Sequence, residues 1–289
     1  MATINTGLIV PEIYAQLVRE KIAGRMQVGQ FLKKIDDLTG DVGETVTMPA
    51  WSYVGDASDW TVGTAMTTKK LAQTKKTATI KAIAAPGVEV YDYDNKVALG
   101  NALDEAAKQQ AISIARKIDI DAINAAYGTP LKQALATKDA ITQTEILSAL
   151  SVYGDERDSE DFTRGAIVMH SAFADDLYGM DLFTSRERTT VAAGSENGIT
   201  KNGVIGQFLG IDVVLSDRLY DSATSEPYLM FIKNDSIGWI PKEAPFVETE
   251  RDASKRLTNI YCSEFYAMAL VRDDGIVLCK KTLPTQEED

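Results

Sequence analysis

The spacing of hydrophobic and polar positions changes several times along this chain, and each change predicts a different element. Near the start, Pro11 suits a first helical turn, and Ile13, Leu17 and Ile22 approximate one apolar face. Glycines at positions 24, 29 and 40 then break the pattern. The sequence therefore predicts an N-terminal arm that carries a helix between residues 10 and 35.

Strand-like alternation replaces the helical pattern between residues 41 and 90. Residues 43–51 and 77–83 alternate polar with apolar side chains, and the stretch between them is rich in glycine, aspartate and threonine. This pattern predicts two long strands joined by a long, poorly packed tip. Because a two-stranded ribbon is only marginally stable in water, it needs another lobe or another subunit as a partner.

The strongest helical pattern in the chain covers residues 94–127. Asp104 and Glu105 lie early in it, and Gly128 and Pro130 end it. At 1.5 Å per residue such a helix would be roughly 45 Å long, whereas globular helices average about 11 to 12 residues. We expect it to form a backbone across an extended subunit. The positions that follow helical spacing are Leu99, Leu103, Ala106, Gln110, Ile114, Ile118 and Ala122.

The second half of the chain predicts a mixed lobe and a set of returning strands. A helix at residues 144–153, a cap at Ser171 with a short helix through Tyr178, and a tight turn at 273–275 are expected. The turn would join strands 265–271 and 276–279 into a hairpin. Further strands are expected at 166–169, 211–215 and 228–232, an acidic loop at 155–161 and a flexible loop at 189–203.

Composition narrows the class of protein. The formal net charge is −12, which argues against a dedicated nucleic-acid binder with a basic face. The sequence has no apolar run of the roughly 20 residues that a membrane span needs and no secretory signal at its start. Cys262 and Cys279 lie in apolar, strand-like segments, so we expect buried thiols in a reducing compartment.

Catalytic and metal-binding patterns are not found in the sequence. The single histidine, His170, follows an apolar strand, which favours a structural role. Asp119 and Asp121 are two residues apart on a helix, which suits separate ion pairs and not an acid/base pair. Neither zinc-ligand spacing nor a phosphate-binding or dinucleotide-binding glycine motif occurs. We therefore expect a protein that is not an enzyme and needs no metal or cofactor.

A group of lysines surrounds the tip of the predicted ribbon. One interpretation is a solvated set of charges that protects strand edges. The other is contact with acidic groups of a neighbouring subunit, which a basic projection on an acidic chain invites. The residues are Lys69, Lys70, Lys75, Lys76 and Lys81.

The order of these elements resembles the Hong Kong 97-type fold of tailed-phage major capsid proteins. The similarity extends over nearly the whole chain, in order, although each short motif alone is weakly specific. The motifs are Pro11-Glu-Ile-Tyr, Gly43-Glu-Thr-Val-Thr-Met-Pro, Lys76-Thr-Ala-Thr-Ile-Lys, Ala115-Arg-Lys-Ile-Asp, Gly203-Val-Ile-Gly and Val247-Glu-Thr-Glu-Arg-Asp.

The resemblance implies an α+β capsid fold with five segments. These would be an N-terminal arm (1–40), an extended loop (41–90), a spine helix (91–130), an axial domain (131–244) and returning strands of the peripheral domain (245–289). It implies a major capsid protein that self-assembles into the icosahedral head around a double-stranded DNA genome. The protein would be assembled in the host bacterial cytoplasm and would reside in the virion.

The partners implied are copies of the same chain, arranged as hexamers and pentamers. Portal and decoration proteins would be further partners, and packaged DNA would be contacted only nonspecifically. The chain begins almost at the arm, so the scaffold would be a separate protein, or assembly would proceed without one. No membrane partner is expected.

Three sets of contacts between subunits are expected. The loop tip would lie over an adjacent subunit, and the arm would pack under a neighbour. Two loops, 155–161 and 189–203, would lie near the capsomer centre. For Trp60 and Met66, packing within their own lobe is the alternative. The named contact residues are Ile13, Tyr14, Leu17, Trp60, Met66, Lys69, Lys70, Asp155 and Asp158.

Some relatives of this fold join subunits by a lysine–asparagine bond. Lys69 or Lys70 could supply the lysine and Asn259 the asparagine, but no motif fixes these positions. Three other classes of protein stay open. They are an encapsulin-like nanocompartment shell protein, a cytosolic enzyme with a mixed lobe, and another phage structural protein such as a tail-tube or decoration subunit.

Overall fold

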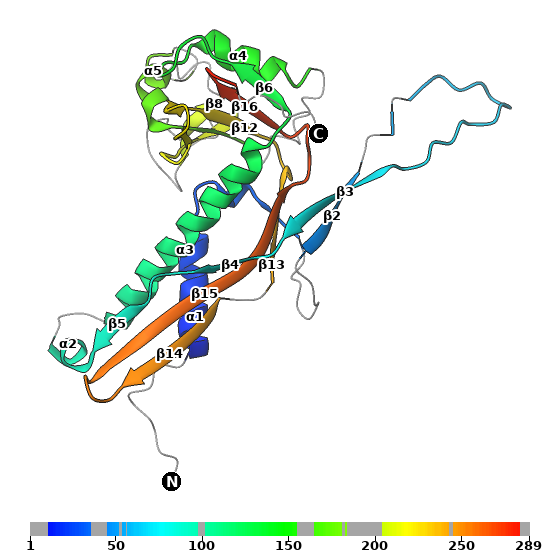
Figure 1. Ribbon diagram of the computed structural model, residues 1–289. Helices are drawn as coiled ribbons and strands as arrows, with labels where there is room; N and C mark the ends of the chain where they lie inside the picture. The colour runs from blue at the N-terminus through cyan, green and yellow to red at the C-terminus, as the bar shows by residue number, and fades with distance from the viewer. Residues whose placement is uncertain are drawn as a thin grey trace.

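The computed structural model describes residues 11–35, 45–51, 54–55, 57–97, 102–154, 165–180, 183, 204–242 and 245–283. Figure 1 shows an elongated molecule with a compact lobe at one end. A long helix runs from this lobe beside a long sheet, and a two-stranded hairpin projects to one side. Helices and strands are mixed throughout, which confirms the predicted α+β class.

Two helices form the helical layer of the long half. α1 (Pro11–Ala23) packs beside α3 (Ala102–Tyr127), whose 26 residues give a rod of about 39 Å. Asp104 and Glu105 in the first turn of α3 suit the positive end of the helix dipole. Within the predicted single helix the structure describes α2 (Asp92–Val97) and α3, and residues 98–101 lie outside the described range.

The long sheet is organised around one strand, β15 (Leu257–Leu270). β14 (Phe246–Asp252) and β5 (Val88–Tyr91) pair with the same part of β15 and so lie on its opposite sides. β4 (Lys81–Ala84) and β13 (Ile237–Pro241) pair with its second half, and β1 (Lys33–Lys34) adds to β13 in parallel. Ile260, Cys262 and Tyr266 of β15 face the two helices and are buried with them.

The compact lobe contains a second six-stranded sheet. Its strand order is β6 (Leu131–Ala134), β16 (Ile276–Lys280), β12 (Leu229–Ile232), β7 (Ala166–Met169), β9 (Ile211–Leu215) and β8 (Val204–Phe208). α4 (Gln143–Ser151) and α5 (Ala174–Tyr178) pack on one face with Ile167 and Met169, and the end of α3 packs on the other with Ala166 and Val168. Burial on both faces explains why β7 is a continuous apolar run.

Short elements complete the description. They are the 3-10 helices η1 (Gly29–Phe31) and η3 (Ser171–Phe173), and the short strands β10 (Tyr220–Asp221) and β11 (Glu226–Pro227). Within the described part of the chain, no helix is long and apolar enough to cross a membrane. Cys262 and Cys279 are free and buried, which confirms the expectation of buried thiols.

The predicted cap at Ser171 is wrong by one residue. Ser171 is the first residue of η3, and the ring of His170 caps it, since Nδ1 accepts a hydrogen bond from the backbone N–H of Ala172 at 3.1 Å. An imidazole nitrogen here replaces the hydroxyl oxygen that usually accepts this bond. The geometry of His170 therefore shows the structural role that the sequence predicted.

The predicted hairpin across residues 273–275 is also wrong. β15 belongs to the long sheet, whereas β16 lies between β6 and β12 in the compact sheet. The sheets likewise cross the predicted domain boundaries. β13 falls in the range 131–244 but pairs in the long sheet, and β16 falls in the range 245–289 but pairs in the compact one.

The ribbon predicted from alternation is confirmed as the antiparallel pair β2 (Thr45–Trp51) and β3 (Gln73–Thr79). Its base is anchored because Met48 and Ala78 are buried with Ile240, Ala267 and Val271. Beyond this base, the described residues of the connecting loop, 54–55 and 57–72, are almost entirely exposed. The hairpin thus projects away from the compact lobe and from the long sheet (Figure 1).

Candidate functional site

The projecting loop carries an unusual number of exposed apolar side chains. Val62 is 85% exposed and Met66 is 68% exposed. Trp60 is half-exposed, and its ring N–H donates a hydrogen bond of 2.9 Å to the carbonyl of Thr64 in a local turn. These values exclude the alternative in which Trp60 and Met66 are packed inside their own lobe. The other exposed apolar side chains here are Trp51, Val54 and Leu71.

The lysines near the hairpin divide into two groups. Lys76 forms an ion pair with Asp273 at 2.7 Å, and Lys81 lies 3.6 Å from Asp121, so both contact their own chain. Lys69, Lys70 and Lys75 are exposed and have no ion-pair partner among the described residues. The loop therefore presents unpaired cations next to exposed apolar surface.

An acidic and aromatic surface lies on the outer face of the long sheet. Val247 of β14 is buried against the helices, so its neighbours Phe246 and Glu248 point outward, and both are exposed. Glu248 pairs with Tyr261 of β15, and the Tyr261 hydroxyl lies 3.5 Å from Glu250. We call this surface the acidic sheet face; its residues are Glu89, Tyr91, Phe246, Glu248, Glu250 and Tyr261.

Helix α1 has two apolar sides. Tyr14 is 3% exposed and donates a hydrogen bond of 2.8 Å to Gln110 of α3, and Val18 and Ile22 continue the same buried row. Ile13 is 60% exposed and Leu17 is 37% exposed on the other side. The predicted face was therefore wrong at Ile22. Tyr14 likewise packs within its own subunit, and the spacing 14, 18, 22 was the signal that could have shown it.

Asp119 joins three parts of the fold. Its carboxylate accepts backbone N–H groups from Gln27, Val28 and Gly29 at 3.1, 3.1 and 2.9 Å, and pairs with Arg218 at 3.2 Å. The side chain is fully buried on α3, and its partners come from the turn after α1 and from the compact lobe. The sequence predicted an ion pair for this residue; the hydrogen bonds to the turn could not be read from spacing.

Asp121 faces a different environment on the same helix. It accepts a hydrogen bond from Tyr266 at 2.8 Å and pairs with Lys117 at 3.1 Å. Burial alone would raise the pKa of Asp121, but the Tyr266 and Lys117 hydrogen bonds and the charge of Lys81 lower it. The expectation of separate ion pairs for the two aspartates is confirmed.

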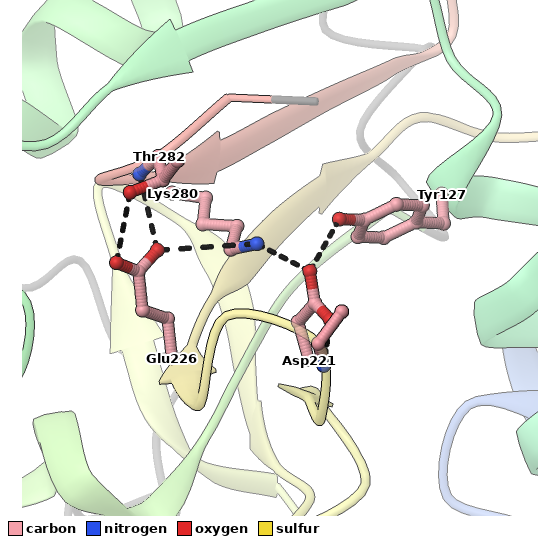
Figure 2. Close-up of polar contacts among 6 residues, drawn as sticks. Tyr127, Asp221, Glu226, Lys280 and Thr282 are labelled. Carbon is pink, nitrogen blue, oxygen red and sulfur yellow. Dashed lines mark hydrogen bonds and ion pairs between the residues drawn. The ribbon is translucent and has the colours of Figure 1, made fainter. Parts of the chain in front are cut away.

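Figure 2 shows a buried lysine that the sequence analysis missed. Lys280 at the end of β16 is 1% exposed and bonds to Asp221, while Glu226 lies 3.9 Å away. Tyr127 donates to Asp221 at 2.9 Å. The hydrogen bond from Lys280 holds the pKa of Asp221 well below its usual range.

Both carboxylates of this cluster are engaged. Glu226 accepts the backbone N–H and the hydroxyl of Thr282 at 3.1 and 2.9 Å, so the cluster fixes the segment after β16 to the compact lobe (Figure 2). A buried lysine that bonds to ionised carboxylates is not poised as a nucleophile. Its geometry supports a structural role. Within the described ranges, no group of three or more histidine, cysteine, aspartate or glutamate residues could hold a metal ion.

The remaining predicted contact residues fall in two classes. Asp155 and Asp158, with the loops 155–161 and 189–203, lie outside the described residues. Asn259 lies on β15, and its side-chain oxygen is buried without a hydrogen-bond partner among the described residues. Figure 1 shows the loop between β2 and β3 far from the part of β15 that pairs with β5 and β14, where Asn259 lies. A bond between them would therefore have to join two copies of the chain.

Comparison with known proteins gives consistent matches. A family model described as phage capsid protein matches residues 87–278. The chain is 26% identical to the major capsid protein of Staphylococcus phage phiMR11, and the match covers 96% of each sequence.

Solved structures extend the similarity at the level of the fold. A chain from Mycobacterium phage Che8 matches with a TM-score of 0.56 and 20% identity, covering 83% of this chain and 85% of that one. A virus-like particle from Pyrococcus furiosus matches with a TM-score of 0.62 and 9% identity, covering 94% of this chain and 100% of that one. At such identities the likeness establishes the fold alone.

Proposed function

Because this chain belongs to the phage capsid protein family, we propose that its exposed surfaces join copies of it into the icosahedral head of a tailed phage. It is a major capsid protein, so its function is to build a shell. The projecting loop carries the proposal, since its apolar side chains are exposed and Lys69 and Lys70 have no ion-pair partner among the described residues. Exposed apolar patches of this kind mark interaction sites.

The acidic sheet face of a neighbouring copy is the partner that we propose for the loop. Lys69, Lys70 and Lys75 would meet the glutamates of that face, and the loop's Trp60 and Met66 would meet its aromatic rings. Charge complementarity steers such contacts and fixes their register, while buried aromatic residues supply most of the binding energy. The loop and the sheet face lie at distant ends of one chain (Figure 1), which favours a contact between copies.

Further features of the assembly are implied by the resemblance of this chain to tailed-phage major capsid proteins. We propose that copies form hexamers and pentamers, with the loops 155–161 and 189–203 near the centre of each. A separate scaffolding protein, a portal and decoration proteins would be additional partners, and assembly would occur in the host bacterial cytoplasm. Contact with packaged double-stranded DNA would be nonspecific, because the chain is acidic with a net charge of −12.

A cellular nanocompartment is the second candidate, because this fold also occurs in a virus-like particle from Pyrococcus furiosus. That likeness concerns the fold, whereas the family model and the phage relative support the phage head. The content of purified shells separates the two. Nuclease-protected DNA supports the phage head, and an enclosed enzyme without DNA supports the nanocompartment.

Charge reversal tests the contact between the loop and the acidic sheet face. We would prepare Lys69→Glu with Lys70→Glu, Glu248→Lys with Glu250→Lys, and all four changes together. Shell yield would be measured by size-exclusion chromatography and negative-stain electron microscopy. We expect each reversed pair to abolish shells and the combination to restore them. Lys281→Glu, an exposed charge on the compact lobe, is the control and should assemble normally.

Two outcomes would contradict the proposal. If either reversed pair assembles as well as the wild type, the loop and the acidic sheet face do not meet. If a folded wild-type chain remains monomeric even with the products of its neighbouring genes, the shell function itself is wrong. Circular dichroism of each variant distinguishes loss of assembly from loss of folding.

A further inference from the structure

A groove runs along the side of α3 that faces away from the core. Its volume is about 410 Å³, and it lies between the helix and the connection from β4 to β5. Ile112, Arg116 and Ile120 are four residues apart and form one row along its helical wall. The opposite wall is formed by Pro86 and Val88. The surface is thus apolar at both ends of the row with a cation between them.

The groove is lined by two cationic side chains, Arg116 and Lys117. Arg116 is exposed and has no ion-pair partner among the described residues. Lys117, which also lines the groove, is exposed and pairs with Asp121 at 3.1 Å. Ile120 is 38% exposed although it belongs to the longest helix of the described chain. An occupant of this groove would therefore need an apolar row and an acidic group one helical turn away.

The exposed side of α1 has these properties. Ile13 and Leu17 are separated by four residues and form an exposed apolar row. Glu20 follows Leu17 by three residues on the same side, and it accepts a hydrogen bond of 3.4 Å from Gln16. Along a helix axis Leu17 and Glu20 are about 4.5 Å apart, and Ile120 and Arg116 about 6 Å apart. These two spacings differ by about 1.5 Å, so Leu17 and Glu20 of one helix can face Ile120 and Arg116 of another at the same time.

We propose that the exposed side of α1 in one copy docks into the α3 groove of a neighbouring copy. Leu17 would contact Ile120 and Glu20 would pair with Arg116, which places Ile13 one helical turn beyond Ile120. This inference rests on the proposed shell function and names the surface that receives the arm. A chain's own α1 cannot fill its groove, because Tyr14 and Val18 already hold that helix against the core side of α3.

The contact has a consequence for assembly. The donor surface on α1 and the acceptor groove on α3 are different parts of one chain, so the interface is heterologous. Interfaces of this kind link copies head to tail, and they form rings where the rotation between copies closes. One copy would then use the two sides of α1 for two purposes, with its buried row serving its own fold and its exposed row serving its neighbour.

Engineered cysteines provide the test. Leu17→Cys and Ile120→Cys would be made in separate chains, mixed, assembled and oxidised with copper phenanthroline. Because Cys262 and Cys279 are buried, they should not react. We expect the mixture to give a covalent dimer on a non-reducing gel, and each variant alone to remain monomeric. The double variant should give a ladder of higher oligomers.

A charge exchange provides the second readout. Arg116→Glu and Glu20→Arg should each reduce shell yield at least tenfold, and the two together should restore it. If shells form normally but the mixed cysteine variants give no covalent dimer, or if one variant is cross-linked to an unrelated protein instead, this inference is wrong. Either outcome leaves the shell function intact. Failure of the wild type to form shells overturns the proposed function instead, so the two failures are distinguishable.

Discussion

Asp119 and Arg218 form an ion pair with 3.2 Å between Oδ2 and Nη1, across 99 residues of sequence. The pair connects the long helix to the compact lobe. Because the same carboxylate also accepts N–H groups from residues 27–29, it fixes the path of the chain after α1. One buried side chain of the long helix thus bonds both to the segment after the arm helix and to the compact lobe.

We predict that Asp119→Asn lowers the free energy of unfolding by about 2–4 kcal/mol, since it leaves Arg218 and several buried N–H groups without their anion. Urea denaturation of the unassembled subunit measures this. Asp104→Asn is the control, because its ion pair with Lys21 is half-exposed and worth about 0–1 kcal/mol. Equal losses in the two variants would contradict the anchoring role of Asp119.

Gly238 is predicted to be indispensable at the base of the hairpin. A Cβ atom at this position would lie 2.7 Å from Met48, 2.8 Å from Val271 and 3.0 Å from Ile35. We expect Gly238→Ala to destabilise the subunit by roughly 1–3 kcal/mol, because overpacking forces the surrounding side chains to move. Thermal unfolding measures the loss. Gly24→Ala, where a Cβ meets nothing within 4 Å, should unfold as the wild type does.

Local patterns predicted the elements of this fold better than their pairing. Alternation between residues 43 and 83 predicted the projecting hairpin, because one face of β2 is anchored by Met48 and the other is exposed. The turn at 273–275 has the composition of a hairpin turn, yet its flanking strands join different sheets. Turn chemistry describes a few residues, whereas β15 also pairs with β4 and β5, and β16 with β6, all more than 100 residues away in sequence.

The candidate contact surfaces also differ in whether the sequence could predict them. The loop was predictable, since its apolar and lysine residues are close together in sequence. The acidic sheet face was not, because Glu89 and Glu248 come from strands that only β15 brings together. The cluster around Lys280 was missed for the same reason, as its partners Asp221 and Glu226 lie in another part of the chain.

The exposed loop side chains should contribute to assembly and not to folding. We predict that Val62→Ala with Met66→Ala changes the free energy of unfolding by less than about 0.5 kcal/mol and reduces shell yield strongly. Met48→Ala is the matched control, since the same change at a fully buried methionine should cost about 2–5 kcal/mol. If the double variant assembles normally, Val62 and Met66 do not contribute to the interface between copies.

Glu264 should make the subunit less stable as the pH rises. It is 4% exposed on β15, and its Oε2 atom has no hydrogen-bond partner among the described residues. Burial raises the pKa of Glu264 to about 7, although the charge of Arg19 opposes this. In the unfolded chain the pKa is about 4.3. The folded state therefore binds more protons between these two values, and stability falls from about pH 4.3 to about pH 7.

Glu264→Gln should remove this dependence, because the amide is never ionised. We predict that it raises the free energy of unfolding at pH 8 by roughly 2–4 kcal/mol and that its advantage shrinks toward pH 5. Urea denaturation at pH 5, 6, 7 and 8 measures the trend. A variant whose stability differs from that of the wild type by the same amount at every pH would contradict the prediction, because it would show that ionisation of Glu264 does not affect stability.

Glu226 provides the control with the opposite sign. Burial alone would raise the pKa of Glu226, but the hydrogen bonds from Thr282 and the charge of Lys280 lower it below its usual value. Its carboxylate therefore stabilises the fold above the unfolded pKa, and that contribution is lost as the pH falls through the folded pKa. Glu226→Gln should consequently be less stable than the wild type at pH 8, where Glu264→Gln is more stable. Both changes replace one glutamate by one glutamine. If both variants gain or both lose stability at pH 8, the substitution itself causes the effect. If one gains stability and the other loses it, the surroundings of each carboxyl cause the effect.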